Sequence, residues 1–231
     1  MKDCCTSFRS LAGLLMYTIA LLPASTYAVT LSPGETVFLP GTTAISRPKT
    51  AGPLLEERVA DFAVEMNGKT VTGAVSQRLR GFQGSTWLID YRITSFDDQG
   101  MGLQIEGLNT QGFFGVGMVG PLDVDYRLDA AGDIVPVTAS LQADGGPVEF
   151  DFGPNPLSAG ETSRWVFIGD PNNDLVIFGD HGAHLLARDP AGTQFSFPFE
   201  SYVTFIPSPT SLPLLAFGLI GLIGIAKRRV H

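Results

Sequence analysis

Cysteine is almost absent from this chain of 231 residues, and only three histidines occur in it. The two cysteines, Cys4 and Cys5, precede the first apolar run, and no cysteine occurs from Val29 to Ile206. A disulfide scaffold and a cysteine-bound zinc site are therefore excluded for this segment. Its 178 residues are enough to bury a hydrophobic core without either kind of cross-link.

Positive charge is also scarce. Between Val29 and Ile206, ten Lys and Arg residues stand against 22 Asp and Glu residues, a net charge of −12. Nucleic acids and anionic membranes both attract a positive surface, so we expect no nucleic acid as a partner of this segment. An acidic surface is compatible with solubility outside the cell and with cation binding, although a merely solvated surface explains it equally simply.

The segment lacks any long run with helical spacing. Instead, Phe62, Val64 and Met66 alternate with polar residues, and the alternation resumes after Asn67-Gly68. Alternation on both sides of Asn-Gly predicts a β-hairpin, because the turn needs two residues with positive φ. Trp87 to Thr94 has the same pattern and is expected to pair antiparallel with the second strand of the hairpin. Further strands are expected at Thr36–Leu39, Met101–Ile105, Val124–Leu128, Ile134–Leu141, Val148–Phe152, Arg164–Ile168, Leu175–Phe178, Ala183–Ala187 and Phe195–Phe205.

These short strands, together with 27 glycines and 16 prolines in the chain, are typical of all-β proteins. We therefore expect residues 29–206 to form one domain, a single antiparallel β-sandwich or jelly roll.

Two apolar runs near the ends of the chain carry signals of their own. At the N-terminal end, Lys2 and Arg9 precede the twelve apolar residues Leu11–Leu22, and Thr26-Tyr27-Ala28 supplies small residues before a cleavage point. This order is typical of a secretory signal peptide, here residues 1–28 with cleavage after Ala28. An uncleaved anchor helix is the alternative, which the shortness of the run and Pro23 disfavour.

At the C-terminal end, Ser211 to Ala226 carries no charge and is followed by Lys227, Arg228 and Arg229. An apolar run closed by basic residues is typical of a transmembrane helix whose charged end stays in the cytoplasm. Sixteen residues span about 24 Å as a helix, less than the roughly 30 Å of a hydrocarbon core. The predicted anchor, 211–226, is therefore short, and a buried core helix is the alternative.

The same segment, residues 207–231, resembles a known sorting signal. Pro207-Ser208-Pro209, then Ser211-Leu212-Pro213-Leu214-Leu215, a glycine-rich apolar run and the basic tail 227–229 are similar to a PEP-CTERM signal. The closest variant has an apolar residue in place of the Glu of Pro-Glu-Pro, where this chain has Ser208. The resemblance implies export from a Gram-negative bacterium, processing by a membrane-embedded exosortase, and delivery from the inner membrane to the envelope or an exopolysaccharide matrix. The preceding segment resembles uncharacterised β-sandwich domains that accompany such signals.

One stretch has the composition of a calcium loop. Asp170, Asn172 and Asp174 place oxygen-bearing side chains at alternate positions, as a tight loop around Ca²⁺ requires. However, Leu175 stands where an EF-hand needs glycine, and His181 stands where it needs glutamate. An Asp- and Asn-rich β-turn is the simpler interpretation, and no other cofactor is indicated.

Candidates for catalysis are weak. Asp180, His181 and His184 could bind zinc, but residues three apart on a strand lie on opposite faces. A Ser/His/Asp triad has no Gly-x-Ser-x-Gly elbow to support it. Carboxylate pairs suited to glycoside hydrolysis are Asp123 with Asp125 and Glu149 with Asp151, about 7 Å apart on one strand face. Alternating acids on a solvent-facing strand explain both pairs more simply.

Trp87 and Trp165 could stack on a sugar ring if they were exposed, but both fall in apolar alternation and are expected in the core. The sequence therefore predicts an exported, envelope-associated protein with a structural or polysaccharide-associated role and no catalysis. Two alternatives stay open. One is a carbohydrate-binding module assisted by Ca²⁺, and the other is a secreted glycoside-active enzyme.

Overall fold

The computed structural model describes residues 28–82, 86–110, 121–144, 146–169 and 176–205. This part of the chain is all-β, with one short 3-10 helix, η1 (Pro48–Ala51). Its strands form two sheets, and every strand pairing within them is antiparallel. The predicted fold class is thus confirmed at this level. The predicted signal peptide and transmembrane helix lie outside the described residues.

The first sheet, sheet A, has six strands in the order β1-β7-β11-β5-β4-β3. The bounds of its strands are β1 Val29–Leu31, β3 Leu54–Met66, β4 Lys69–Phe82, β5 Thr86–Asp97, β7 Leu122–Tyr126 and β11 Val166–Gly169. The second sheet, sheet B, has seven strands, in the order β13-β12-β6-β9-β8-β2 with β10 also paired to β6. The bounds of its strands are β2 Thr36–Phe38, β6 Gln104–Thr110, β8 Thr138–Leu141, β9 Val148–Asp151, β10 Leu157–Ser158, β12 Val176–Arg188 and β13 Gln194–Phe205.

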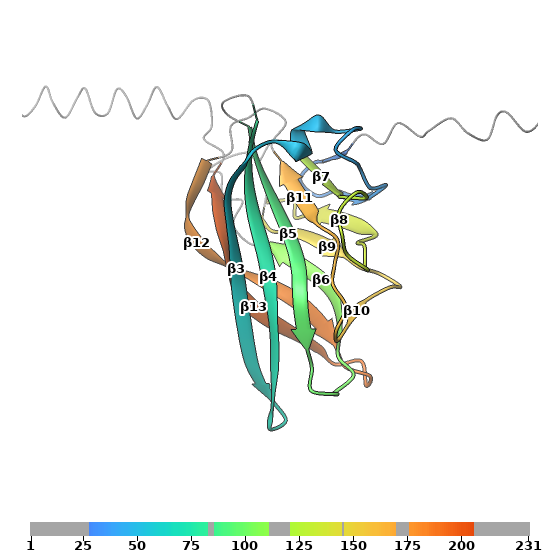
Figure 1. Ribbon diagram of the computed structural model, residues 1–231. Coiled ribbons are helices and arrows are strands. Elements are labelled where there is room, and N and C mark those ends of the chain that lie inside the picture. Colours follow the sequence, from blue (N-terminus) through green and yellow to red (C-terminus); the bar gives the residue numbers. More distant parts are fainter. Residues whose placement is uncertain (1–27, 83–85, 111–120, 145, 170–175, 206–231) are drawn as a thin grey trace, which may run out of the picture.

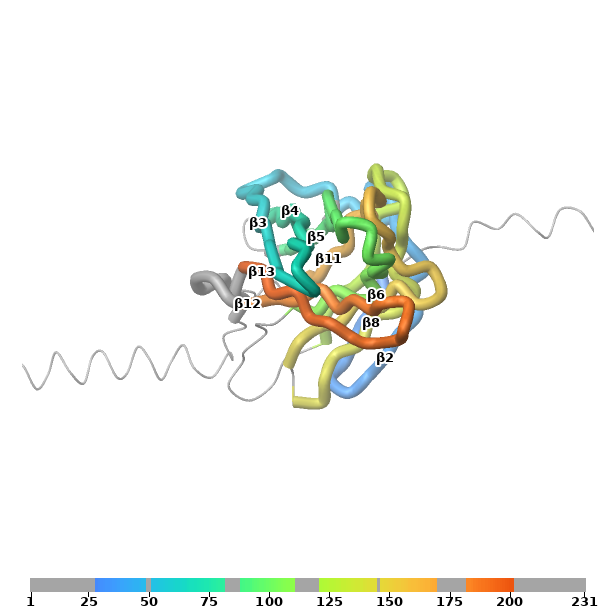
Figure 2. The backbone as a smooth tube through the Cα atoms, turned by 90° about the horizontal axis from the view of Figure 1, so that it is seen from below, coloured from blue at the N-terminus to red at the C-terminus, as the bar shows by residue number. Residues whose placement is uncertain are grey.

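The two sheets face each other, as in a β-sandwich, and share one hydrophobic core (Figure 1). Ile89 and Ile93 of sheet A and Phe150 of sheet B are fully buried in the same cluster. At one edge the ring of Phe62 on β3 stacks on that of Phe197 on β13, with centroids 5.7 Å apart. This contact joins the two sheets where β3 and β13 run beside each other, as the end-on view also shows (Figure 2).

The predicted hairpin is confirmed. Asn67 and Gly68, between β3 and β4, have φ of 51° and 74°, as the two central residues of a type I′ turn require. β5 pairs antiparallel with β4, also as predicted. The inward positions on β5 are Ile89, Tyr91 and Ile93, which the period-two pattern had assigned to one face.

Some strand boundaries differ from the predictions. Leu175–Phe178 and Ala183–Ala187 were expected as two strands, but residues from Val176 to Arg188 form the single strand β12. An irregularity in its pairing between Ile177 and Asp180 absorbs the interruption of the pattern. The strand expected at Ile134–Leu141 begins only at Thr138, and Ile134 instead makes an isolated bridge to Ser163.

Residues 40–53, which connect β2 to β3, cross the outer face of sheet A, and we call them the strap. Thr42 pairs with sheet A through hydrogen bonds from its N–H to Tyr126 O and from Leu128 N–H to its own carbonyl, both 2.8 Å. Farther along, η1 lies against β4. The strap thus gives sheet A a second covered face, opposite the main core.

Candidate functional site

The first cluster of charged residues lies on the outer face of sheet A. The strand register places Arg78, Asp90, Phe167 and Asp125 side by side on β4, β5, β11 and β7. Asp90, Phe167 and Asp125 are almost completely buried. Asp125 was interpreted from the sequence as one of several solvent-facing acids, and that interpretation is wrong, because the strap covers this part of the sheet.

Asp125 anchors the strap. Its Oδ1 accepts hydrogen bonds from the backbone N–H of Gly41 and of Tyr126, both at 2.8 Å. Nearby, Asp123 forms an ion pair with Arg47 of the strap, and Asp129 Oδ2 accepts from the N–H of Ala44 at 2.7 Å. The carboxylates of β7 and of the residues just after it therefore hold a loop in place.

Asp90 anchors the other end of the strap indirectly. Its Oδ2 accepts a hydrogen bond from Arg80 Nε at 2.6 Å, and Arg80 Nη1 donates to the carbonyl of Gly52 at 3.0 Å. Burial raises the pKa of Asp90 to about 6, although Arg80 opposes the change. Burial likewise raises the pKa of Asp125 to about 6, against the effect of its two backbone donors.

These contacts engage the side chains of this face that the sequence offered as a carboxylate pair or a sugar platform. The predicted pair Asp123 and Asp125 is occupied by Arg47 and by backbone N–H groups. Trp165 is buried, as expected, but it lies outside the main core, with the guanidinium of Arg78 4.0 Å above its ring. The side chain of Trp87 lies outside the part of the structure that is described.

The second predicted pair lies on the outer face of sheet B. Glu149 on β9 is half-buried, and Asp151 is exposed. Burial, and then the charge of Asp151, raises the pKa of Glu149. Asn109 pairs with Glu149 on one side and with His184 on the other, so these three residues are cross-strand neighbours. Asp151 Oδ1 accepts from the N–H of Gly153 at 2.7 Å, which is an ordinary turn contact.

The remaining predicted ligands are only partly described. Asp170, Asn172 and Asp174 lie outside the described residues, as do the side chains of Asp180 and His181. His184 is half-buried, and its Nδ1 lies 2.9 Å from Ser196 Oγ. Within the described ranges, no group of three or more His, Cys, Asp or Glu side chains could hold a metal ion. The same ranges contain no helix of the length and hydropathy needed to span a membrane.

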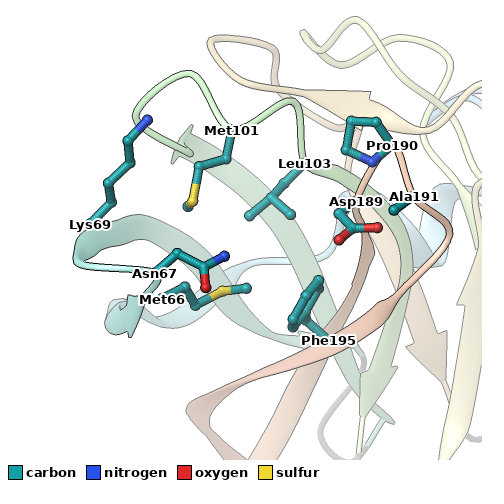
Figure 3. Close-up of a pocket in the computed structure, with 9 residues that line it drawn as sticks. All are labelled: Met66, Asn67, Lys69, Met101, Leu103, Asp189, Pro190, Ala191 and Phe195. Carbon is teal, nitrogen blue, oxygen red and sulfur yellow. The ribbon is translucent and has the colours of Figure 1, made fainter.

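A pocket that the sequence did not indicate lies at one end of the space between the sheets (Figure 3). Three turns surround it: the β3–β4 hairpin turn, the loop that leads from β5 into β6, and the β12–β13 turn. Its volume is about 390 Å³. The residues that line it are Met66, Asn67, Lys69, Met101, Leu103, Asp189, Pro190, Ala191 and Phe195.

The loop from β5 to β6 is fixed by a buried aspartate. Asp98 Oδ1 accepts from the N–H of Gly100 at 2.9 Å, and its Oδ2 accepts from the N–H of Leu103 at 2.7 Å. This arrangement holds Met101 and Leu103 over the end of the core, where both point into the pocket (Figure 3). The sequence places a methionine beside each of two predicted turns, but this alone does not show that the two turns lie together and form a pocket.

Comparisons with known protein families, with characterised proteins and with solved structures find no match to this chain.

Proposed function

We propose that this chain is an exported protein of a Gram-negative cell envelope, processed by an exosortase, with a single β-sandwich domain as its working part. The domain, residues 29–206, acts in a structural or polysaccharide-associated role at the surface and performs no catalysis. The observation that carries the proposal is the uncharged run Ser211–Ala226 closed by Lys227, Arg228 and Arg229, with a second apolar run at Leu11–Leu22.

Features of the described residues are in keeping with this role. The fold is all-β with two antiparallel sheets, and the long strands β3 and β4 need no cross-link or cofactor to pair over their whole length. Asp123 and Asp125, the two carboxylates of β7, serve to hold the strap. A domain built in this way is suited to a structural role at the surface.

The test is an intact-mass measurement of the protein isolated from its own cells, combined with fractionation of the envelope. We expect a species that begins at Val29 and has lost residues at the C-terminal end. Replacing Lys227, Arg228 and Arg229 with serine should prevent retention at the membrane and C-terminal processing, because the stop signal for translocation is removed. Replacing Lys49 with serine, in η1 of the strap, is the matched control and should leave processing unchanged. Recovery of the unprocessed chain from the cytosol would overturn the proposal.

A further inference from the structure

We infer that the pocket at the end of the two sheets binds a small aliphatic carboxylic acid in its ionised form. Its carboxylate group lies at Lys69, and its alkyl tail lies between Met66, Met101 and Phe195. This binding site is independent of where the protein is sorted.

Six of the nine residues that line the pocket are apolar. Met66 comes from sheet A and Phe195 from sheet B, and both are half-buried side chains packed against the shared core. Leu103 forms part of the wall and is itself buried. Figure 3 shows these side chains and that of Met101 directed toward a common space. An alkyl chain inserted here would extend the hydrophobic core outward, and methionine thioethers adapt readily to such a guest.

The lining carries one positive and one negative side chain, and the positive one, Lys69, can pair with an anionic head. Lys69 is the only cation among the nine lining residues, and it is exposed. Its Nζ donates one hydrogen bond, to the carbonyl of Gln99 at 2.9 Å, and an ammonium has three donors. Asp189 faces the same space, but its Oδ1 is engaged by the N–H of Thr193 at 2.7 Å and serves the β12–β13 turn.

The size of the pocket sets the length of the guest. A volume of about 390 Å³ corresponds to about thirteen water molecules at ~30 Å³ each. A carboxylate with about eight to ten carbon atoms fits this space. Each added methylene should tighten binding about fourfold until the pocket is full, since burial of one methylene contributes that much to the binding constant.

The experiment uses the purified full chain and follows oxidation of Met66 and Met101 by hydrogen peroxide with peptide mass spectrometry. Sodium hexanoate, octanoate and decanoate are added in turn, and the matching alcohols are the uncharged comparison. We expect protection of both methionines at concentrations that fall about fourfold per methylene, with the alcohols requiring more. The matching alcohols also report any general effect of an amphiphile on the oxidation.

Two variants and one control variant separate binding from folding. Lys69→Gln should bring the carboxylates to the level of the alcohols, while Lys49→Gln, the matched lysine control, should behave as the parent protein. Ala191→Trp, at an exposed position on the rim, should block entry and abolish protection without disturbing the core.

Other outcomes would overturn the inference. These are equal oxidation with and without decanoate, equal protection by carboxylate and alcohol, and protection that grows with protein concentration in the absence of ligand. The last result would show that a second copy of the chain occupies the pocket instead.

Discussion

Asp90 and Asp125 are charged groups placed where a hydrophobic residue would ordinarily lie. Each is buried on the outer face of sheet A beside Phe167. Among the described residues, Oδ1 of Asp90 and Oδ2 of Asp125 have no hydrogen-bond partner. Ionisation of such a group is costly, because the buried environment stabilises a charge less well than water does. The two aspartates therefore make the stability of the protein depend on pH.

The expected dependence follows from the direction of the pKa shifts. The pKa of each group is about 6 in the folded protein and 3.8 as the ordinary value. Between these values the folded state holds protons that the unfolded state has released, so stability falls as pH rises through this window. Thermal melting followed by circular dichroism should give a higher midpoint at pH 5 than at pH 7.5.

Variants identify the groups responsible. Asp125→Asn keeps an oxygen for the N–H of Gly41 and should reduce the dependence between pH 5 and 7.5 to the part that Asp90 contributes. Asp61→Asn, at an exposed position on β3, should leave it unchanged. The charge of Asp129 acts in the opposite direction but only at lower pH, because Arg127 lowers the pKa of its carboxyl. A midpoint that is higher at pH 7.5 than at pH 5 would contradict the account.

Among the secondary-structure elements, the sequence predicts those whose determinants are local. Asn67-Gly68 and the alternation around it define the β3–β4 hairpin, since both the turn and the pleat depend on adjacent residues. The strap was not predicted, because nothing near Asp125 in the sequence shows that Gly41, 84 residues earlier, will donate to it. The pocket was missed for the same reason, since Met66, Met101 and Phe195 meet only through the pairing of distant strands.

The contact between β3 and β13 depends on a glycine. Gly73 on β4 lies opposite Phe62, and a Cβ at Gly73 would come within 2.3 Å of the Phe62 ring and 2.8 Å of Ser95 O. Because Phe62 stacks on Phe197, moving its ring would disturb the edge where the sheets join. Gly73→Ala should therefore lower the free energy of unfolding by about 1–3 kcal/mol, as overpacking of a core does.

Gly182 on β12 provides the matched control. It is exposed, and a Cβ there would meet nothing within 4 Å. Gly182→Ala should leave the free energy of unfolding unchanged or raise it slightly, because alanine restricts the unfolded chain. Urea denaturation of the two full-length variants makes the comparison. Equal stabilities would show that Phe62 moves aside without cost and that the edge contact is not tight.

At the scale of the whole molecule, sheet A has two covered faces, which distinguishes this protein from a plain pair of sheets. One face contributes to the core shared with sheet B, and the other lies under the strap with Trp165 and Phe167 buried. Both faces are formed by alternate residues of the same strands, so loss of strand pairing removes the supports of both. The strap and the main core should consequently unfold together.

Trp165 reports on this coupling, because it lies on the strap side of sheet A and contacts Arg78. In a Trp87→Phe variant, Trp165 is the only tryptophan left. Its fluorescence and the far-ultraviolet circular dichroism should change with the same midpoint in urea, since one cooperative unit gives coincident transitions. A fluorescence change at lower urea would mean that the strap detaches while the sheets persist. In that case Asp90 and Asp125 would become hydrated when the strap detaches. The pH dependence would then belong to detachment of the strap and not to unfolding of the sheets.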